Sequence, residues 1–320
     1  MISNLFGEPN NVFQHMMHVP YDTTPPGVYS AATLYKGYDH HRPETFATCY
    51  DQAVYKFFII EGKITTDPKE SMARASHDHY VLQGIYDLFR KYDPRQVVGV
   101  MGGSAMKRTD DAYRQIVLIA KHLTEAGSLM VSGGGSGAME ATSLGGFLAG
   151  RDDSDIDQAL EILVQAPDYH SPGYMETAFE VIDKLPSTGQ YNCLAIPTWL
   201  YGHEPTAPFA SHIGKLFCNS VREDILLTVS FGGIIFTPGS AGTMQEIFQE
   251  AVQNHYLTLG IASPMVFLGE EFWTETMPAY AMLKHLSETG RYKNLLLSIT
   301  DDPATAVATI LDFQRTAKGK

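Results

Sequence analysis

The chain has 320 residues, of which 44% are hydrophobic and 18% are charged, a mix typical of one large globular domain or two smaller ones. Its formal net charge of −13 argues against DNA or RNA as the main partner, because proteins that bind these polymers usually carry a basic face. A small phosphorylated ligand is compatible with this charge, since it needs only local hydrogen-bond donors.

The sequence predicts a cytoplasmic protein. Its three cysteines, Cys49, Cys193 and Cys218, form no CxxC motif, which favours small buried side chains in a reducing compartment. The first residues lack a basic segment followed by an apolar run, so no signal peptide is expected. No stretch approaches the roughly 20 apolar residues of a membrane span, so no membrane partner is expected.

Residues 1–92 are predicted to form an N-terminal arm and a helix, ahead of a Rossmann-like domain at residues 93–320. The chain to about residue 70 is rich in Pro, His, Tyr and Asn. This composition indicates an irregular arm with one short apolar piece, "AVYKFFII", which wraps the main domain or a partner subunit. From Asp67 the pattern is helical, with an N-cap candidate, a proline beside it and a second proline as the stop.

The remaining chain alternates short apolar runs with amphipathic helical patterns. Helices are predicted at residues 110–127, 137–150 and 301–316, and strands at residues 96–101, 128–134, 192–197, 232–238, 263–269 and 295–300. This alternation predicts an α/β fold with a doubly wound, mainly parallel, Rossmann-like sheet. Residues 151–190 contain two helical patterns and no clear strand, and are therefore predicted to be a helical insertion, either a lid or an oligomer contact.

Three glycine-rich turns follow predicted strands, at residues 100–108, 132–140 and 237–246. Ligands bind outside the carboxyl ends of the strands in such sheets, and a turn that leads into a helix presents free N–H groups to an anion. Each turn alone has an alternative explanation in tight packing, but three at one edge favour a phosphate site. No turn matches the P-loop or the GxGxxG fingerprint, so a hydride-transfer cofactor is not favoured.

Two of these turns carry a family resemblance. "GGGSGAM" followed by "PGSAGTMQE" resembles the GGGxxGxM and PGGxGTxxE motifs of the LOG-type (Lonely Guy) family, often labelled lysine decarboxylases, over roughly residues 96–315. The resemblance implies a phosphoribohydrolase that cleaves nucleoside 5′-monophosphates to free base and ribose 5-phosphate. The long N-terminal extension is similar to that of the related bacterial nucleotide 5′-monophosphate nucleosidases. A homodimer or higher homo-oligomer is also implied.

The resemblance assigns site residues by their place in these motifs. Arg222, in "FCNSVREDILL", and Glu246, the last residue of "PGSAGTMQE", are the implied catalytic residues. The implied phosphate- and nucleotide-binding residues are Gly103, Ser104, Gly133, Gly134, Gly135, Gly137, Met139, Pro238, Gly239, Ser240, Ala241, Gly242 and Thr243. The alternatives are a helix-dipole role for Glu246, a solvated face for Arg222 and a core position for Met139.

Cleavage of an N-glycosidic bond builds positive charge on the sugar. Glu246, expected in the first turn of a helix that begins at Thr243, would stabilise this charge and orient or activate water. Arg222 would orient Glu246 or the phosphate and keep the carboxylate ionised. The sequence departs from the motifs at Ser240 (usually Gly), Glu223 (usually Lys) and Gln245 (usually an acid), which puts substrate choice and turnover in question.

Other functions remain open from the sequence. The main alternative is a Rossmann-like nucleotide sensor or carrier without turnover, whereas a pyridoxal-dependent decarboxylase is disfavoured because no lysine has a convincing Schiff-base setting. The histidines of "HHRPE", "SHDHY" and "YGHE" lack a known ligand spacing, so neither a functional metal nor a bound cofactor is predicted. The aromatic segment at residues 196–209 is either a base-stacking wall or a dimer contact.

Overall fold

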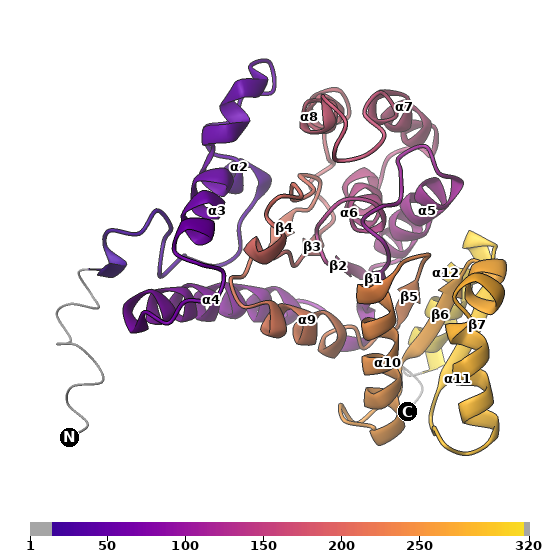
Figure 1. The fold of residues 1–320 in the computed structure, drawn as a ribbon. Helices are drawn as coiled ribbons and strands as arrows, with labels where there is room; N and C mark the ends of the chain where they lie inside the picture. The colour runs from indigo at the N-terminus through magenta and orange to yellow at the C-terminus, as the bar shows by residue number, and fades with distance from the viewer. Residues whose placement is uncertain (1–14, 317–320) are drawn as a thin grey trace, which may run out of the picture.

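A seven-stranded, entirely parallel sheet forms the centre of the computed structural model, which describes residues 15–316 (Figure 1). The strands run in the order β4-β3-β2-β1-β5-β6-β7. Their bounds are β1 Val97–Met101, β2 Leu129–Ser132, β3 Cys193–Ala195, β4 His212–Ile213, β5 Ile234–Phe236, β6 Pro264–Leu268 and β7 Leu296–Thr300. The predicted α/β class and parallel sheet are therefore confirmed, and all six predicted strands are present.

The strand order reverses at β1, which pairs with β2 on one side and with β5 on the other. The chain moves outward from β1 through β2 and β3 to β4, and then returns to the other side of β1 to build β5, β6 and β7. A crevice is expected where the order reverses, at the carboxyl ends of the strands. The predicted glycine-rich turns after β1, β2 and β5 all lead to this place.

Two groups of helices flank the sheet. In one group α5 (Asp111–Glu125) packs against α6 (Ala138–Leu148) and α12 (Pro303–Thr316). In the other α10 (Ala241–Tyr256) packs against α9 (Asn219–Thr228) and α11 (Ala279–Glu288). Short 3-10 or π-type turns lie at Pro43–Thr48, Pro94–Gln96, Trp199–Tyr201 and Phe272–Thr276. No helix among residues 15–316 combines the length and apolarity that a membrane crossing needs.

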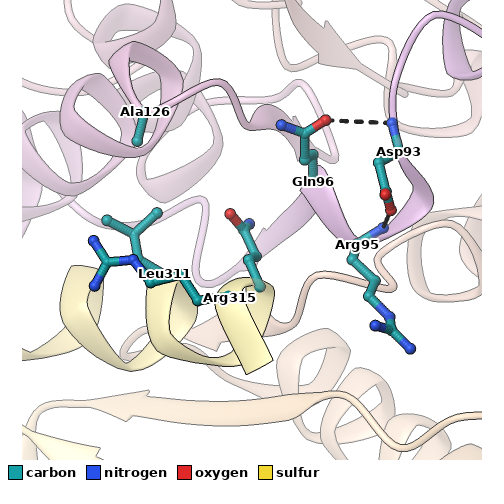
Figure 2. A pocket seen from close by; sticks show the side chains of 7 residues that line it. Asp93, Arg95, Gln96, Ala126, Leu311 and Arg315 are labelled. Carbon is teal, nitrogen blue, oxygen red and sulfur yellow. Dashed lines mark hydrogen bonds between the residues drawn. The ribbon is translucent and has the colours of Figure 1, made fainter. Parts of the chain in front are cut away.

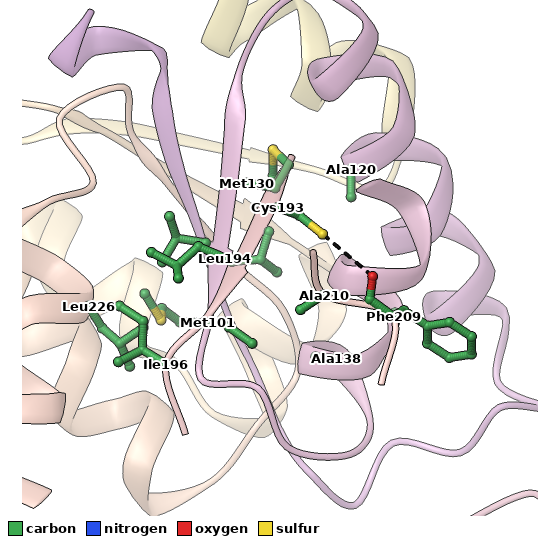
Figure 3. Packing of buried hydrophobic residues seen from close by; sticks show 14 of the residues in the cluster. Met101, Ala120, Met130, Ala138, Cys193, Leu194, Ile196, Phe209, Ala210 and Leu226 are labelled. Carbon is green, nitrogen blue, oxygen red and sulfur yellow. Dashed lines mark hydrogen bonds between the residues drawn. The ribbon is translucent and has the colours of Figure 1, made fainter. Parts of the chain in front are cut away.

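The core lies between the strands and these helices (Figure 3). Met101, Met130 and Leu194 from three neighbouring strands are almost wholly buried, together with Leu226 of α9. Cys49 and Cys193 are buried free thiols, as predicted, but Cys218 is exposed, because it stands ahead of α9. The apolar burial fixes the strands that carry the three turns.

The N-terminal segment is more regular than predicted. It contains α2 (Ala31–Leu34) and α3 (Tyr50–Ile60), and α3 includes the apolar piece that the composition predicts as part of an irregular arm. α4 (Pro68–Phe89) begins as expected, with the Asp67 carboxylate accepting a hydrogen bond from the Lys69 N–H. The first 14 residues of the predicted arm lie outside the described part of the chain.

Buried polar contacts join this N-terminal segment to the chain before and after β4, beside which α2 and α3 lie (Figure 1). The Asp51 carboxylate accepts from the ammonium of Lys215 (2.6 Å) and from the indole N–H of Trp199 (3.1 Å). The Asp78 carboxylate accepts main-chain N–H groups of Phe217 (2.9 and 3.1 Å) and Cys218 (2.8 Å). These two residues directly precede α9, so α4 supplies the hydrogen-bond acceptor at the amino end of that helix.

The predicted insertion contains two helices, α7 (Ser154–Leu163) and α8 (Tyr174–Lys184), as expected. Arg108 anchors it, because its guanidinium pairs with Glu140 (2.6 and 2.8 Å) and also donates to the carbonyls of Ala166 and Tyr174. All these groups are buried, so the insertion is firmly attached to the turn after β1 and to α6.

Candidate functional site

Hydrogen bonds tie the three glycine-rich turns together at the carboxyl edge of β1, β2 and β5. The N–H of Gly103 donates to the carbonyl of Pro238 (3.0 Å), and the carbonyl of Gly103 accepts from the N–H of Ala138 (3.2 Å). The Ser136 hydroxyl donates to the carbonyl of Ser104 (2.9 Å). The turn after β1 therefore lies between the other two and connects them.

The turns enclose a cavity of about 230 Å³. Its walls are formed by Gly102, Gly103, Ser104, Met139, Tyr201, Glu204, Arg222, Glu223, Ser240, Gly242, Thr243 and Glu246. A smaller hollow of about 40 Å³ adjoins it, shares Met139, Tyr201, Glu204 and Arg222, and adds Gly133, Gly135, Pro197, Thr198 and Thr206. The remaining residues named from the motifs, Gly134, Gly137, Pro238, Gly239 and Ala241, belong to the same turns but line neither hollow.

Arg222 projects from α9 and is 8% exposed, so its alternative placement on a solvated face is wrong. Its Nε donates to the carbonyl of Ile196 (3.0 Å) and its Nη2 to the carbonyl of Gly133 (3.3 Å). A Cβ at Gly133 would collide with Nη2, so this turn admits the guanidinium only because residue 133 is glycine. The resulting position places a fixed positive charge between the two hollows.

Glu246 lies in the second turn of α10 rather than the first, because the helix begins at Ala241, two residues earlier than predicted. Its half-buried carboxyl faces the cavity. Burial raises the pKa of Glu246 to about 7; Arg222 lowers this pKa and Glu223 raises it. Arg222 thus favours the ionised carboxylate, as expected, but desolvation outweighs this attraction, because the hydrogen bonds of the guanidinium go to main-chain carbonyls.

The amino end of α10 forms the opposite wall. Ser240 is its N-cap with φ −121°, so the position of the usual glycine does not require the left-handed region here. The first N–H groups of a helix have no intrahelical acceptor, and here Gly242 and Thr243 of this first turn line the cavity. The wall thus combines helix N–H groups with two hydroxyls, which suits an anion.

Sequence reasoning overlooked Glu204. It stands in "YGHE", next to His203, and its Oε1 accepts a hydrogen bond from the Ser104 hydroxyl (3.3 Å). Its place soon after β3 was the available signal, since residues beyond strand ends line such crevices. The aromatic segment at residues 196–209 divides between two roles: Trp199 is buried against His77 and Phe217, whereas Tyr201 lines the cavity.

Other hollows lie outside this site. A groove of about 910 Å³ between α4, α9 and α10 meets the cavity at Tyr201 and Glu223. A hollow of about 250 Å³, lined by Asp93, Arg95, Gln96, Ala126, Leu311, Gln314 and Arg315, is at the opposite, amino-terminal end of β1 (Figure 2). This second hollow lies at the other edge of the sheet from the three turns and shares no residue with them.

One group in the described residues has the composition of a metal site. His40, His41 and Asp183 place one ligand atom each within 4.8 Å of one another, and His40 Nε2 lies 3.1 Å from Asp183 Oδ2. The group joins the N-terminal segment to α8 and none of its members lines the cavity.

Several solved structures are similar to this chain, and three of them are described here. The molybdenum cofactor binding protein from the phototrophic bacterium Rippkaea orientalis has a TM-score of 0.41 and 14% identity, covering 68% of this chain and 95% of its own. Two structures of the molybdenum cofactor carrier protein from Chlamydomonas reinhardtii each have a TM-score of 0.40, with 17% and 16% identity, covering 68% and 69% of this chain and 98% of theirs. No family model and no curated protein sequence matches the chain.

The fold defines the class of protein as α/β, with a Rossmann-like, seven-stranded parallel sheet. The similarity to the cofactor-binding and carrier proteins concerns the fold and assigns no activity at these identities.

Proposed function

We propose that the 230 Å³ cavity binds a nucleoside 5′-monophosphate and that the protein hydrolyses its N-glycosidic bond to free base and ribose 5-phosphate. The observation that carries the proposal is the meeting of Arg222 and Glu246 with the amino end of α10 in one cavity. The 5′-phosphate would accept hydrogen bonds from the first-turn N–H groups and from the hydroxyls of Ser240 and Thr243.

Glu246 would act on the sugar and on water. As the bond between the sugar and the base nitrogen breaks, the base takes the bonding electron pair and the sugar becomes oxocarbenium-like; the base then receives the proton that Glu246 removes from water. The carboxylate of Glu246 stabilises that charge and accepts a proton from the attacking water. A pKa of about 7 suits this proton transfer near neutral pH, because the same group can then give the proton up again.

A second candidate is a nucleotide or nucleotide-like carrier or sensor without turnover. It is favoured by the arrangement of Arg222, whose hydrogen bonds hold the main chain rather than Glu246. It is also favoured by Glu223, which stands 3.6 Å from the guanidinium and adds negative charge to the cavity. In this case the ligand binds intact.

A product assay separates the two candidates. The purified protein is incubated with AMP, GMP, CMP, UMP and IMP separately, and free base and ribose 5-phosphate are measured by chromatography, with binding followed by calorimetry. Base release that is lost in Glu246→Gln, with binding retained, supports the nucleosidase. Binding without release supports the carrier, and neither binding nor release refutes both.

Gly242→Ala tests the phosphate position. A Cβ at Gly242 meets no atom within 4 Å in the protein, so the fold tolerates it, and alanine is the better residue in a helix. If the phosphate occupies the space beside this turn, the added methyl group weakens ribose 5-phosphate and nucleotide binding about tenfold or more while thermal stability is kept. Unchanged affinity would place the phosphate elsewhere.

A further inference from the structure

The two adjoining hollows differ in the groups that line them. The residues of the α10 amino end, Ser240, Gly242 and Thr243, line only the larger hollow. The smaller hollow is walled by Met139, Pro197 and the glycine turn after β2, and shares Tyr201 with the larger one. The helix N–H donors are therefore at one end only, whereas Met139 and Tyr201 extend apolar and aromatic surface from that end into the smaller hollow.

Glu204 is the carboxylate shared by both hollows. Its main-chain N–H donates to the carbonyl of Tyr201 (2.9 Å), which closes a turn, and its Oε1 accepts from the Ser104 hydroxyl (3.3 Å). Its Oε2 would lie 3.4 Å from a Cβ at Gly135, so the side chain is directed across the glycine turn. A carboxylate here accepts from N–H donors in the hollow that the α10 amino end does not line, which favours the base on this side.

We propose, on the basis of the nucleotide-binding function above, that Glu204 selects a ring with two adjacent N–H donors, the 2-amino-4-oxopyrimidine edge of guanine. A carboxylate accepts two parallel hydrogen bonds from the N1–H and 2-amino group of guanine. Adenine and cytosine offer one amino group beside an acceptor, and hypoxanthine and uracil offer one N–H between carbonyls or beside a C–H. Tyr201, 46% exposed, is placed to stack on the ring.

A comparison of GMP with IMP tests this, because the two differ only in the 2-amino group. Calorimetry on the wild-type protein is expected to give GMP about tenfold tighter binding than IMP or AMP. Glu204→Gln should remove that preference without weakening the binding of ribose 5-phosphate. A wild-type preference for AMP or IMP, or a GMP preference that survives in Glu204→Gln, overturns the proposal.

Glu223→Gln is the matched control. Glu223 lines the larger hollow but not the smaller one, so its loss should change the affinity of all nucleotides by a similar factor and keep their order. If Glu223→Gln also loses the GMP preference, the selectivity depends on the net charge of the cavity, and the proposed role of Glu204 is overturned. Thermal unfolding of both variants checks that they are folded.

The same edge occurs in pterins, so a free pterin forms a further arm of the experiment. If GMP binds weakly but pterin binds, and if pterin binding weakens in Glu204→Gln, then Glu204 recognises this edge and the natural ligand is a pterin. Failure of ribose 5-phosphate and of every nucleotide to bind refutes the proposed nucleotide-binding function itself. Nucleotide binding without base preference refutes only the role of Glu204.

Discussion

Replacement of Glu246 by glutamine is expected to stabilise the protein in alkaline solution while it removes the proposed catalytic group. Burial raises the pKa of Glu246 from 4.5 to about 7. A change of one in pKa is worth about 1.4 kcal/mol, so the full difference corresponds to about 3 kcal/mol. Because the side chain is only half-buried, water screens part of this cost, and a gain of about 1–2 kcal/mol is expected.

The sign follows from proton binding. Between pH 4.5 and about 7 the folded protein keeps a proton on Glu246 that the unfolded chain has released, so the free energy of unfolding falls as the pH rises through this window. Glutamine does not titrate. The advantage of Glu246→Gln should thus be small at pH 5, grow toward pH 7 and stay at its full value at pH 8.

Urea unfolding of wild type and variant at pH 5 and pH 8 measures the effect. Glu250→Gln is the control, because Glu250 lies one turn later in α10, its pKa is also raised to about 7 by burial, and it lines no part of the cavity. It should show the same pH trend with ligand binding unchanged. An advantage of Glu246→Gln that is equal at both pH values would refute the reasoning.

Three further predictions concern the support of the site. Gly133→Ala should displace Arg222 and weaken nucleotide binding about tenfold in calorimetry, and an unchanged affinity would contradict the close approach described above. Asp78→Asn should lower the free energy of unfolding by about 1–3 kcal/mol in urea, because amides ahead of α9 lose part of their acceptor; a smaller loss would show that water replaces it. Lys215→Met should cost about 3 kcal/mol or more, since it leaves the Asp51 carboxylate buried without its cation, and a neutral result would contradict that burial.

The sheet was predictable because its central strands are short apolar runs that are buried on both faces. β1, β2, β5 and β6 are buried at every position, so their sequences carry no polar alternation to mislead. β4 was not predicted because it is only two residues long, His212–Ile213. Its pairing with β3 makes it a strand, and its composition gives no signal of one. The helix α3 was not predicted, because a short apolar run does not distinguish a helix from a strand.

The site was predictable where a local motif encodes it. The turns, Arg222 and Glu246 follow from short sequence patterns, and the structure brings them to one cavity, although their roles remain proposals. The protonation of Glu246 was not predictable, because its pKa depends on how deeply α10 packs beside α9. Glu204 belongs to neither family motif, and its contact with Ser104 joins segments far apart in the chain.

The contact of Asp78 with the residues ahead of α9 has a consequence for how the protein can be divided. The helix that carries Arg222 begins against a carboxylate from α4. A fragment that starts at residue 93 would therefore leave the amides of Phe217 and Cys218 unpaired, and Trp199 would lose the rings of Tyr29 and His77. The N-terminal segment and the sheet should consequently melt in one transition. Substitutions in α4 can therefore shift the position of Arg222 although α4 does not line the cavity. Evolution can alter the geometry of the site through this helix.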